Sequence, residues 1–174
     1  GVTVTSERRQ AAEALSFGLE SDGFVLLEEH LSGEEASVLV VMDESGYVCL
    51  PASQDHKRVG EGDTGSNTGG MGAYSPAAII TEEMSARIMD EIINPTIRGA
   101  AADGRPYKGV LYAGLMFTKK GPQLIEYNVR FGDPECQPMM MRLKSDALEM
   151  LLACAEGRLD KIKLEWHENA ALTV

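Results

Sequence analysis

The sequence predicts an α+β fold with a largely antiparallel sheet flanked by helices. Two pairs of apolar segments are each joined by a short turn, as in β-hairpins, and helical patterns lie between and after them. The chain of 174 residues is long enough for a hydrophobic core. Its 44% hydrophobic and 25% charged residues are ordinary for a globular protein, so no fibrous or disordered class is indicated.

The first 30 residues predict one helix and one strand. Ser6 is expected to cap a helix that runs to about Leu19 with an apolar stripe on one side. The stripe consists of Ala11, Ala14, Leu15 and Leu19. Phe24–Glu28 follows as a strand because it is a short apolar run.

Two hairpins are predicted further along the chain. The first joins residues 37–42 to residues 47–50, and the second joins residues 109–118 to residues 122–127. Each connection is short and contains glycine, which favours a tight turn. These four strands are the expected sheet.

A helix is expected between the hairpins. Thr81 opens it, and acidic residues follow in the first turn, where the helix dipole favours them. Met84, Ile88 and Ile92 are spaced by four and predict its buried face. Pro95 is expected to end or kink this helix because proline has no N–H to donate.

The last helix is expected to begin after Ser145 and to end at Gly157. Its inward residues are predicted to be Leu148, Leu151, Leu152 and Ala155. The tail predicts a short strand in Ala171–Val174. Gly1–Val4 and this last segment both resemble interrupted strands, so we expect the chain to be a piece of a longer polypeptide.

Charge and cysteine usage restrict the class of partner. The net charge of −11 argues against a nucleic acid or an anionic membrane. The sequence has no apolar run of about 18 residues and no secretory leader pattern. Its three cysteines are widely spaced and form no CxxC, which favours a reducing compartment. We therefore expect a cytoplasmic protein that acts on small molecules.

The most informative segment is the predicted strand that carries Glu126, Asn128 and Arg130. Side chains alternate along a strand, so these three are expected on one face, with Ile125, Tyr127 and Val129 on the other. A carboxylate, an amide oxygen and a guanidinium in one row suit a Mg²⁺-bound phosphate. A half-exposed sheet face with a Glu–Arg pair would give the same pattern, and both interpretations stay open on these residues alone.

A glycine-rich segment spans residues 60–72. Gly60–Gly65 matches GxGxxG, but no helix can start in the residues that follow, and no Gly-Lys-Ser/Thr occurs, so neither a dinucleotide fingerprint nor a P-loop is indicated. We expect a long loop whose N–H groups bind an anion, although a mobile surface loop is the alternative. The preceding Gln54–Arg58 supplies cations for a phosphate or carboxylate, or is a solvated charge run.

Four segments together resemble the phosphoribosylamine–glycine ligase family of purine biosynthesis. They are Glu28–Ser37, Gln54–Arg58, Asn67–Tyr74 and Arg130–Glu135. The resemblance implies an ATP-grasp fold in which nucleotide lies between two α+β subdomains. It further implies that residues 1–30 are a remnant of an incomplete small lid subdomain, and that residues 31–174 form the large lobe.

The resemblance also implies a reaction and its cofactors. ATP, glycine and 5-phosphoribosylamine would give ADP, phosphate and glycinamide ribonucleotide through glycyl phosphate, with Mg²⁺ or Mn²⁺ bound to the nucleotide. Carboxylate and ATP repel one another, so the metal and cationic side chains must offset the charge. The segment is expected to be inactive alone, and a fusion to other purine enzymes in the parent chain stays open.

By the same resemblance each motif has an expected role. The metal ligands would be Glu126 and Asn128, and the catalytic side chains Arg130, Lys57 and His56. Contacts to the adenine and ribose would come from Glu28, Glu29, Leu31 and Glu35. The residues facing the γ-phosphate and substrates would be Asp55, Arg58, Asn67, Thr68, Gly69, Gly70, Asp133 and Glu135.

The chain departs from the family pattern at its start. Gly1-Val2 aligns just after the family's ATP-phosphate lysine, which is therefore absent from this sequence, as are the family's N-terminal and C-terminal subdomains. Two other interpretations remain. One is a different ATP-grasp carboxylate–amine ligase or a carboxylase, and the other is a non-catalytic nucleotide-binding module.

Overall fold

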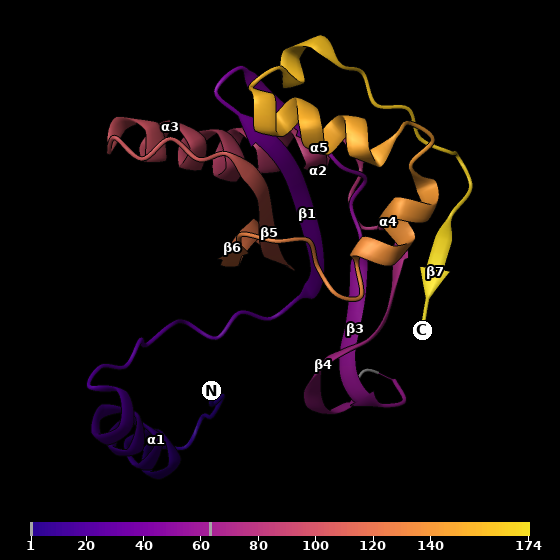
Figure 1. The fold of residues 1–174 in the computed structure, drawn as a ribbon. Helices are drawn as coiled ribbons and strands as arrows, with labels where there is room; N and C mark the ends of the chain where they lie inside the picture. The colour runs from indigo at the N-terminus through magenta and orange to yellow at the C-terminus, as the bar shows by residue number, and fades with distance from the viewer. Residues whose placement is uncertain (1, 63) are drawn as a thin grey trace. The chain divides into compact units, whose positions relative to one another are not determined.

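The computed structural model describes residues 2–62 and 64–174, so Gly1 and Asp63 of the segments discussed above lie outside the described residues. The chain forms two compact units, Gly1–Ser32 and Gly33–Val174 (Figure 1). None of the helices in the described residues has the length and apolarity needed to cross a membrane.

The first unit contains helix α1, Arg8–Asp22. The prediction that Ser6 caps this helix is wrong, because the N-cap is Glu7, whose side chain makes no capping hydrogen bond. The helix ends at Gly23, where a left-handed conformation (φ 78°) lets the backbone N–H donate to the carbonyl of Leu19. No residue of α1 is buried, so the expected apolar stripe stays partly exposed.

The expected strand Phe24–Glu28 does not form. No described residue pairs with this segment, and its large apolar side chains are exposed. A strand needs a hydrogen-bonded neighbour, which local sequence preference cannot supply. The segment instead lies close to α1 at Gly18, where an added Cβ would come within 2.7 Å of Val25 Cγ2.

The second unit is built on a four-stranded antiparallel sheet in the order β2-β1-β5-β6. Its strands are β1 (Glu34–Asp43), β2 (Gly46–Cys49), β5 (Gly109–Thr118) and β6 (Gly121–Asn128). Both predicted hairpins are therefore confirmed. The two hairpins are joined through β1 and β5, which pair along their whole lengths.

One face of this sheet is covered by a continuous helical segment (Figure 1). It consists of α2 (Glu82–Ile88), the π-helical turn η1 (Met89–Ile93) and α3 (Asn94–Ala102). The predicted Thr81 cap is confirmed, and so is the buried face, with Ile88 and Ile92 buried and Met84 packed beside them. Pro95 does not end the helix. It lies in the first turn of α3, directly after the π-helical turn, and the chain continues as a helix beyond it.

The opposite face is covered at one end only. The covering elements are α4 (Cys136–Arg142), α5 (Ala147–Glu156) and the 3₁₀ turn η2 (Leu159–Lys161). Together with the sheet they bury a second cluster, formed by Leu39, Val41, Leu50, Tyr112, Met139, Met150, Ala153, Cys154 and Leu159. The sheet is therefore a central layer between helices at this end.

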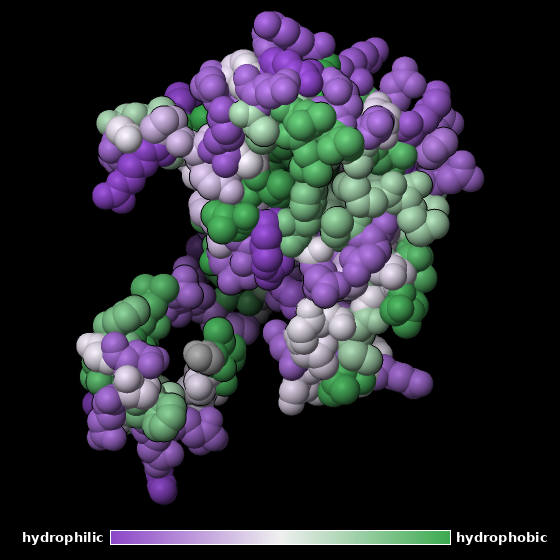
Figure 2. Space-filling view, in the orientation of Figure 1, coloured by the Kyte–Doolittle hydropathy of each residue, from purple (hydrophilic) through white to green (hydrophobic). Residues whose placement is uncertain are grey.

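The predicted inward face of α5 is wrong. Its buried residues are Met150, Ala153 and Cys154. The residues that were expected inside are exposed, namely Leu148, Leu151, Leu152 and Ala155. Apolar side chains surround this helix, so more than one stripe had helical spacing. Figure 2 shows the resulting hydrophobic surface over α5.

The cap of α5 also differs from the prediction. Asp146 is the N-cap, and its Oδ1 accepts a hydrogen bond from the backbone N–H of Leu148 at 2.7 Å. Ser145 Oγ instead accepts from the backbone N–H of Glu165 at 2.7 Å. The predicted end at Gly157 is confirmed, with a left-handed φ of 69°.

A second antiparallel sheet has the order β3-β4-β7. Its strands are β3 (Gln54–Gly60), β4 (Thr64–Ser75) and β7 (Ala171–Thr173). The short C-terminal strand is confirmed. The glycine-rich segment is not the structureless loop we expected, because most of it is strand β4. An isolated bridge between Ser37 of β1 and Ser53, the residue directly before β3, links the two sheets.

Candidate functional site

Polar residues gather on the part of the sheet face that α4 and α5 leave open. Glu35 and Ser37 of β1 lie on the same face as the buried Leu39, because side chains alternate along a strand. The register places Ser37 opposite Gly114 of β5, and Gly114 opposite Glu126 of β6. This line crosses three strands and borders a small pocket.

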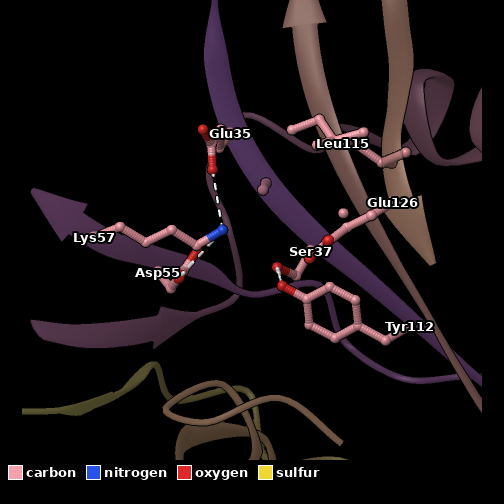
Figure 3. A pocket seen from close by; sticks show the side chains of 10 residues that line it. Glu35, Ser37, Asp55, Lys57, Tyr112, Leu115 and Glu126 are labelled. Carbon is pink, nitrogen blue, oxygen red and sulfur yellow. Dashed lines mark hydrogen bonds and ion pairs between the residues drawn. The ribbon is translucent and has the colours of Figure 1, made fainter. Parts of the chain in front are cut away.

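Strand β3 adds Asp55 and Lys57 to the pocket (Figure 3). Lys57 Nζ lies 3.2 Å from Glu35 Oε2 and 3.8 Å from Asp55 Oδ2. Figure 3 shows the ammonium group between the two carboxylates. The pocket therefore brings carboxylates from both sheets together around a lysine.

Burial and charge act in opposite directions on this group of side chains. Burial raises the pKa of Asp55 to about 6, although the nearby Lys57 opposes the shift. Burial alone would lower the pKa of Lys57, but the charges of Asp55 and Glu35 outweigh it and raise that pKa above its ordinary value. Lys57 is therefore a fixed positive charge at neutral pH.

Glu126 and Asn128 share one face of β6, as predicted. Asn128 Nδ2 donates to Glu126 Oε1 at 3.1 Å, and the intervening Tyr127 packs on the opposite face, with its hydroxyl against Thr96 of α3. The strand ends at Asn128, so Arg130 is not part of the row we expected. Arg130 is exposed and donates Nη1 to the carbonyl of Phe131 at 2.8 Å.

A bulge in β6 changes the predicted alternation at Ile125. Leu115 of β5 pairs with Leu124, whereas Gly114 pairs with Glu126, so Ile125 is one extra residue on β6. Ile125 consequently borders the pocket beside Glu126, where we expected it on the other face. The bulge lies directly before the two candidate metal ligands and sets the direction of their side chains.

Alternation along β3 divides the Gln54–Arg58 segment. Asp55 and Lys57 border the pocket, whereas His56 stacks on Tyr74 with ring centroids 5.9 Å apart. Arg58 donates Nη1 to the carbonyl of Gly65 at 2.8 Å, within its own hairpin. The structure therefore does not bring His56 and Arg58 to the pocket that Lys57 occupies.

The glycine-rich strand β4 bulges opposite Lys57. His56 pairs with Gly72, but Arg58 pairs with Asn67, so β4 contains extra residues between them. Within the bulge, Thr68 Oγ1 donates to the carbonyl of Lys57 at 2.8 Å and accepts from the N–H of Gly70 at 3.1 Å. Gly69 is exposed. The bulge holds the backbone of β3 at the residue that carries the cation.

Gly70 brings two of the predicted motifs into contact. It has a φ of 133°, and an added Cβ would lie 2.5 Å from Pro134 Cδ. The segment that follows β6 therefore packs against the bulge of β4. Within this segment Asp133 is exposed and accepts a hydrogen bond from Gln137, whereas Glu135 is buried.

The expected adenine contacts lie in a different unit. Glu28, Glu29 and Leu31 belong to the segment that follows α1, where Glu28 and Glu29 are exposed and Leu31 is half-buried. Glu35, the expected ribose contact, lies in the second unit and pairs with Lys57. Glu35 borders the pocket.

Sequence reasoning missed the two hydroxyl-bearing residues of the pocket, Ser37 and Tyr112. Both lie in strongly apolar strands, where a hydroxyl group is the only signal that could have singled them out. Their hydroxyl oxygens are 2.6 Å apart, and Figure 3 shows the pair beside Glu126. Burial, followed by a hydrogen bond to Glu135, raises the pKa of Tyr112, so its hydroxyl keeps its proton.

This sheet, open on one polar face and carrying a carboxylate–amide pair beside a lysine, is that of an ATP-grasp protein. The sequence model of the phosphoribosylglycinamide synthetase ATP-grasp (A) domain family matches residues 1–136. The chain belongs to this family. The expected ATP-grasp fold is thereby confirmed.

Curated proteins similar to this chain are named phosphoribosylamine–glycine ligase. The phosphoribosylamine–glycine ligase of Agrobacterium fabrum is 56% identical over 180 residues, which cover the whole chain and 42% of that protein. The ligase of Vigna unguiculata is 50% identical over 182 residues, which cover the whole chain and 58% of that protein. The chain thus spans about half the length of these relatives.

Solved structures agree with this placement. The phosphoribosylamine–glycine ligase of Thermotoga maritima has a TM-score of 0.75 at 31% identity, covering 95% of this chain and 42% of that one. The biotin carboxylase domain of the Hydrogenobacter thermophilus 2-oxoglutarate carboxylase has a TM-score of 0.66 at 16% identity, covering 94% of this chain and 35% of that one. The second likeness shows the fold alone.

Proposed function

We propose that this chain supplies the ATP-binding and phosphoryl-transfer part of an enzyme that ligates glycine to 5-phosphoribosylamine. The products would be glycinamide ribonucleotide, ADP and phosphate. The observation that carries the proposal is the Glu126–Asn128 pair on the open sheet face, where Glu126 borders the same pocket as Lys57, in a chain 56% identical to a named phosphoribosylamine–glycine ligase.

The donor set fits Mg²⁺ or Mn²⁺ held jointly with ATP phosphates. Mg²⁺ is usually bound through one or two protein carboxylates together with phosphate oxygens and water. Glu126 would supply a carboxylate and Asn128 an amide oxygen. Across residues 2–62 and 64–174, no group of three or more His, Cys, Asp and Glu suited to a metal occurs, which agrees with a site completed by the nucleotide. When bound, the ion would neutralise charge on the phosphates.

The chain's own cations would bring two anions together. In the proposed reaction a carboxylate oxygen of glycine attacks the γ-phosphorus of ATP, and ADP leaves. The nitrogen of phosphoribosylamine then attacks the carbonyl carbon of glycyl phosphate, and phosphate leaves. Lys57 would offset the repulsion in the first step, and Arg130 would steady the transferred phosphoryl group. His56, which faces away from the pocket, has no contact that supports its expected catalytic role.

The remaining assignments follow the family pattern. We propose that residues 1–30 belong to a small lid, that residues 31–174 form the large lobe, and that Glu28, Glu29, Leu31 and Glu35 serve the adenosine end of ATP. Asp55 and Thr68 contact Lys57, Gly70 donates to Thr68, and Asn67 pairs with Arg58. These residues would form the substrate side. The enzyme would be cytoplasmic.

A chimeric ligase tests the proposal. In it, this chain replaces the corresponding part of the Agrobacterium fabrum enzyme, which supplies the rest of the polypeptide. We expect Mg²⁺-dependent formation of glycinamide ribonucleotide from glycine, and no product from the 174-residue chain by itself. ATP turnover that depends on bicarbonate and not on glycine would instead identify a carboxylase. Binding of Mg·ATP without any turnover would identify a non-catalytic module.

A further inference from the structure

Three buried polar side chains form a triangle of oxygen atoms beside the pocket. Tyr112 donates its hydroxyl to Glu135 Oε1 at 2.6 Å, and Ser37 Oγ lies 3.0 Å from the same carboxylate oxygen and 2.6 Å from the Tyr112 hydroxyl, so its single proton is donated to one of the two at a time. Glu135 is only 2% exposed. The triangle therefore attaches the segment that precedes α4 to β1 and β5, two neighbouring strands of the first sheet.

The triangle lies directly beside the candidate metal ligands. In the register of the sheet Tyr112 is opposite Asn128, while Ser37 is opposite Gly114, which in turn is opposite Glu126. Tyr112 and Ser37 also border the same pocket as Glu126. A shift of the Tyr112 or Ser37 side chain would therefore displace the strand positions that carry the candidate metal ligands.

Glu135 is also the fixed end of the segment that begins at Arg130. Gly132 packs so closely on the buried carboxylate that an added Cβ would lie 2.2 Å from Glu135 Oε2. Pro134 packs on Gly70 of the β4 bulge. The segment is thus held to the first sheet by the carboxylate and to the second sheet by the proline, and Arg130 lies at its start.

The chemistry of the triangle suits a positioning role more than contact with substrate. A carboxylate with 2% exposure cannot reach a ligand in the pocket, and both hydroxyl groups are already engaged with it. Buried polar networks of this kind fix geometry because an unpaired member is costly. Phosphoryl transfer in turn depends on placement, and a misplacement of about 1 Å can cost on the order of 100-fold in rate.

We propose that Glu135 is a positioning residue. Through Tyr112 and Ser37 it holds the Arg130–Glu135 segment in register with the strands that carry Glu126 and Asn128, so that guanidinium and metal ligands keep a fixed spacing around the phosphates. This inference rests on the proposed function, and it replaces the direct substrate contact that the family pattern implied for Glu135.

The test uses the chimeric ligase with Tyr112→Phe, which removes one hydroxyl from the triangle and no charge. Tyr107→Phe is the matched control, because Tyr107 donates its hydroxyl to the carbonyl of Val110 at 2.7 Å, away from the triangle. We expect Tyr112→Phe to lower kcat about 10-fold and to raise the Mg²⁺ concentration for half-maximal rate, with KM for glycine unchanged. The melting temperature should fall further than in the control, because a buried carboxylate loses one donor, so kcat and the Mg²⁺ dependence are compared at a temperature at which both variants are folded.

Other outcomes would overturn the inference. Equal kcat and equal Mg²⁺ dependence in the two variants would assign the triangle a purely structural role. A raised KM for glycine in Glu135→Gln, with normal kinetics in Tyr112→Phe, would restore the direct substrate contact. If Tyr112→Phe does not fold, Ser37→Ala removes the other donor and carries the same expectation.

Failure of the proposed function would be recognised separately. In that case the unmodified chimera forms no glycinamide ribonucleotide, and calorimetric binding of Mg·ATP becomes the measurement for the same variants. We then expect about 10-fold weaker binding by Tyr112→Phe than by Tyr107→Phe. Identical affinities would reject the positioning role.

Discussion

Replacing Glu126 by alanine should remove metal-dependent turnover while leaving the fold intact. Glu126 is exposed, and its hydrogen bond from Asn128 at 3.1 Å is an interaction at the surface. Exposed substitutions of this kind change the free energy of unfolding by about 0.5 kcal/mol or less. Loss of a group that stabilises charge in the transition state typically costs ~10²- to 10³-fold in kcat, or about 3 to 4 kcal/mol.

The two magnitudes separate catalysis from folding in one experiment. ADP release by the chimeric ligase is measured over a range of Mg²⁺ concentrations, and urea unfolding is measured on the same samples. Glu34→Ala is the matched control, because Glu34 is an exposed carboxylate on the same sheet that neighbours Glu35 but faces the other way. A Glu126→Ala enzyme with near-normal kcat would refute the ligand assignment, as would a loss of stability above about 2 kcal/mol without loss of rate.

Three further predictions concern the stability of the chain. Burial raises the pKa of Asp55 to about 6 from an ordinary value of 3.8, so its contribution to the free energy of unfolding is lost as pH rises from about 4 to about 6. Asp55→Asn should flatten this pH dependence in urea unfolding. It should also stabilise the chain at pH 7.5 by up to about 3 kcal/mol. Gly70→Ala should lower the melting temperature by several degrees, because its Cβ would meet a proline ring at 2.5 Å in a left-handed backbone, whereas Gly69→Ala has open space and should leave it unchanged. Met150→Ala should cost about 2 to 5 kcal/mol in the same urea assay and Leu151→Ala less than about 1 kcal/mol, and the reverse order would support the inward face first expected for α5.

Local signals were enough to predict most of the sheet. The two hairpins have short glycine-containing turns between apolar runs, and both formed as expected. Thr81 caps its helix with its own side chain, and Gly157 ends its helix with a backbone conformation that glycine favours. Both helix ends could therefore be predicted from the residue type and its place in the sequence. In contrast, Phe24–Glu28 has the composition of a strand but no partner among the described residues, and pairing is not a local property.

The predictions were wrong where a sequence pattern is compatible with more than one structure. The leucines of α5 have helical spacing, but so do the residues that are buried instead, and only tertiary packing distinguishes the two faces. The composition of the glycine-rich segment is typical of a loop, yet its backbone pairs with β3, and residues 73–75 directly after it pair with β7. Sheet pairing here overrides the low strand preference of glycine.

The candidate site was predicted where alternation along one strand defines it. Glu126 and Asn128 lie on one face as expected, whereas the alternation along β3 that brings Asp55 and Lys57 to the pocket without His56 was not predicted. The bulge at Ile125 and the end of β6 before Arg130 were not foreseeable, since both depend on the register with β5. Ser37 and Tyr112 were missed because their role depends on hydrogen bonding to Glu135, which is distant in the sequence.

The missing side chain of Gly114 has a consequence for how the site could be lost in evolution or blocked by design. An alanine Cβ at this position would meet Glu126 Cγ and Tyr112 Cε1 at 3.5 Å, which is ordinary contact, so the strand should tolerate it. A larger side chain, such as that of valine or leucine, would take up space in the pocket that Gly114 borders. Such a variant would keep a folded sheet but obstruct a nucleotide bound there. A single substitution would then abolish nucleotide binding without unfolding the protein.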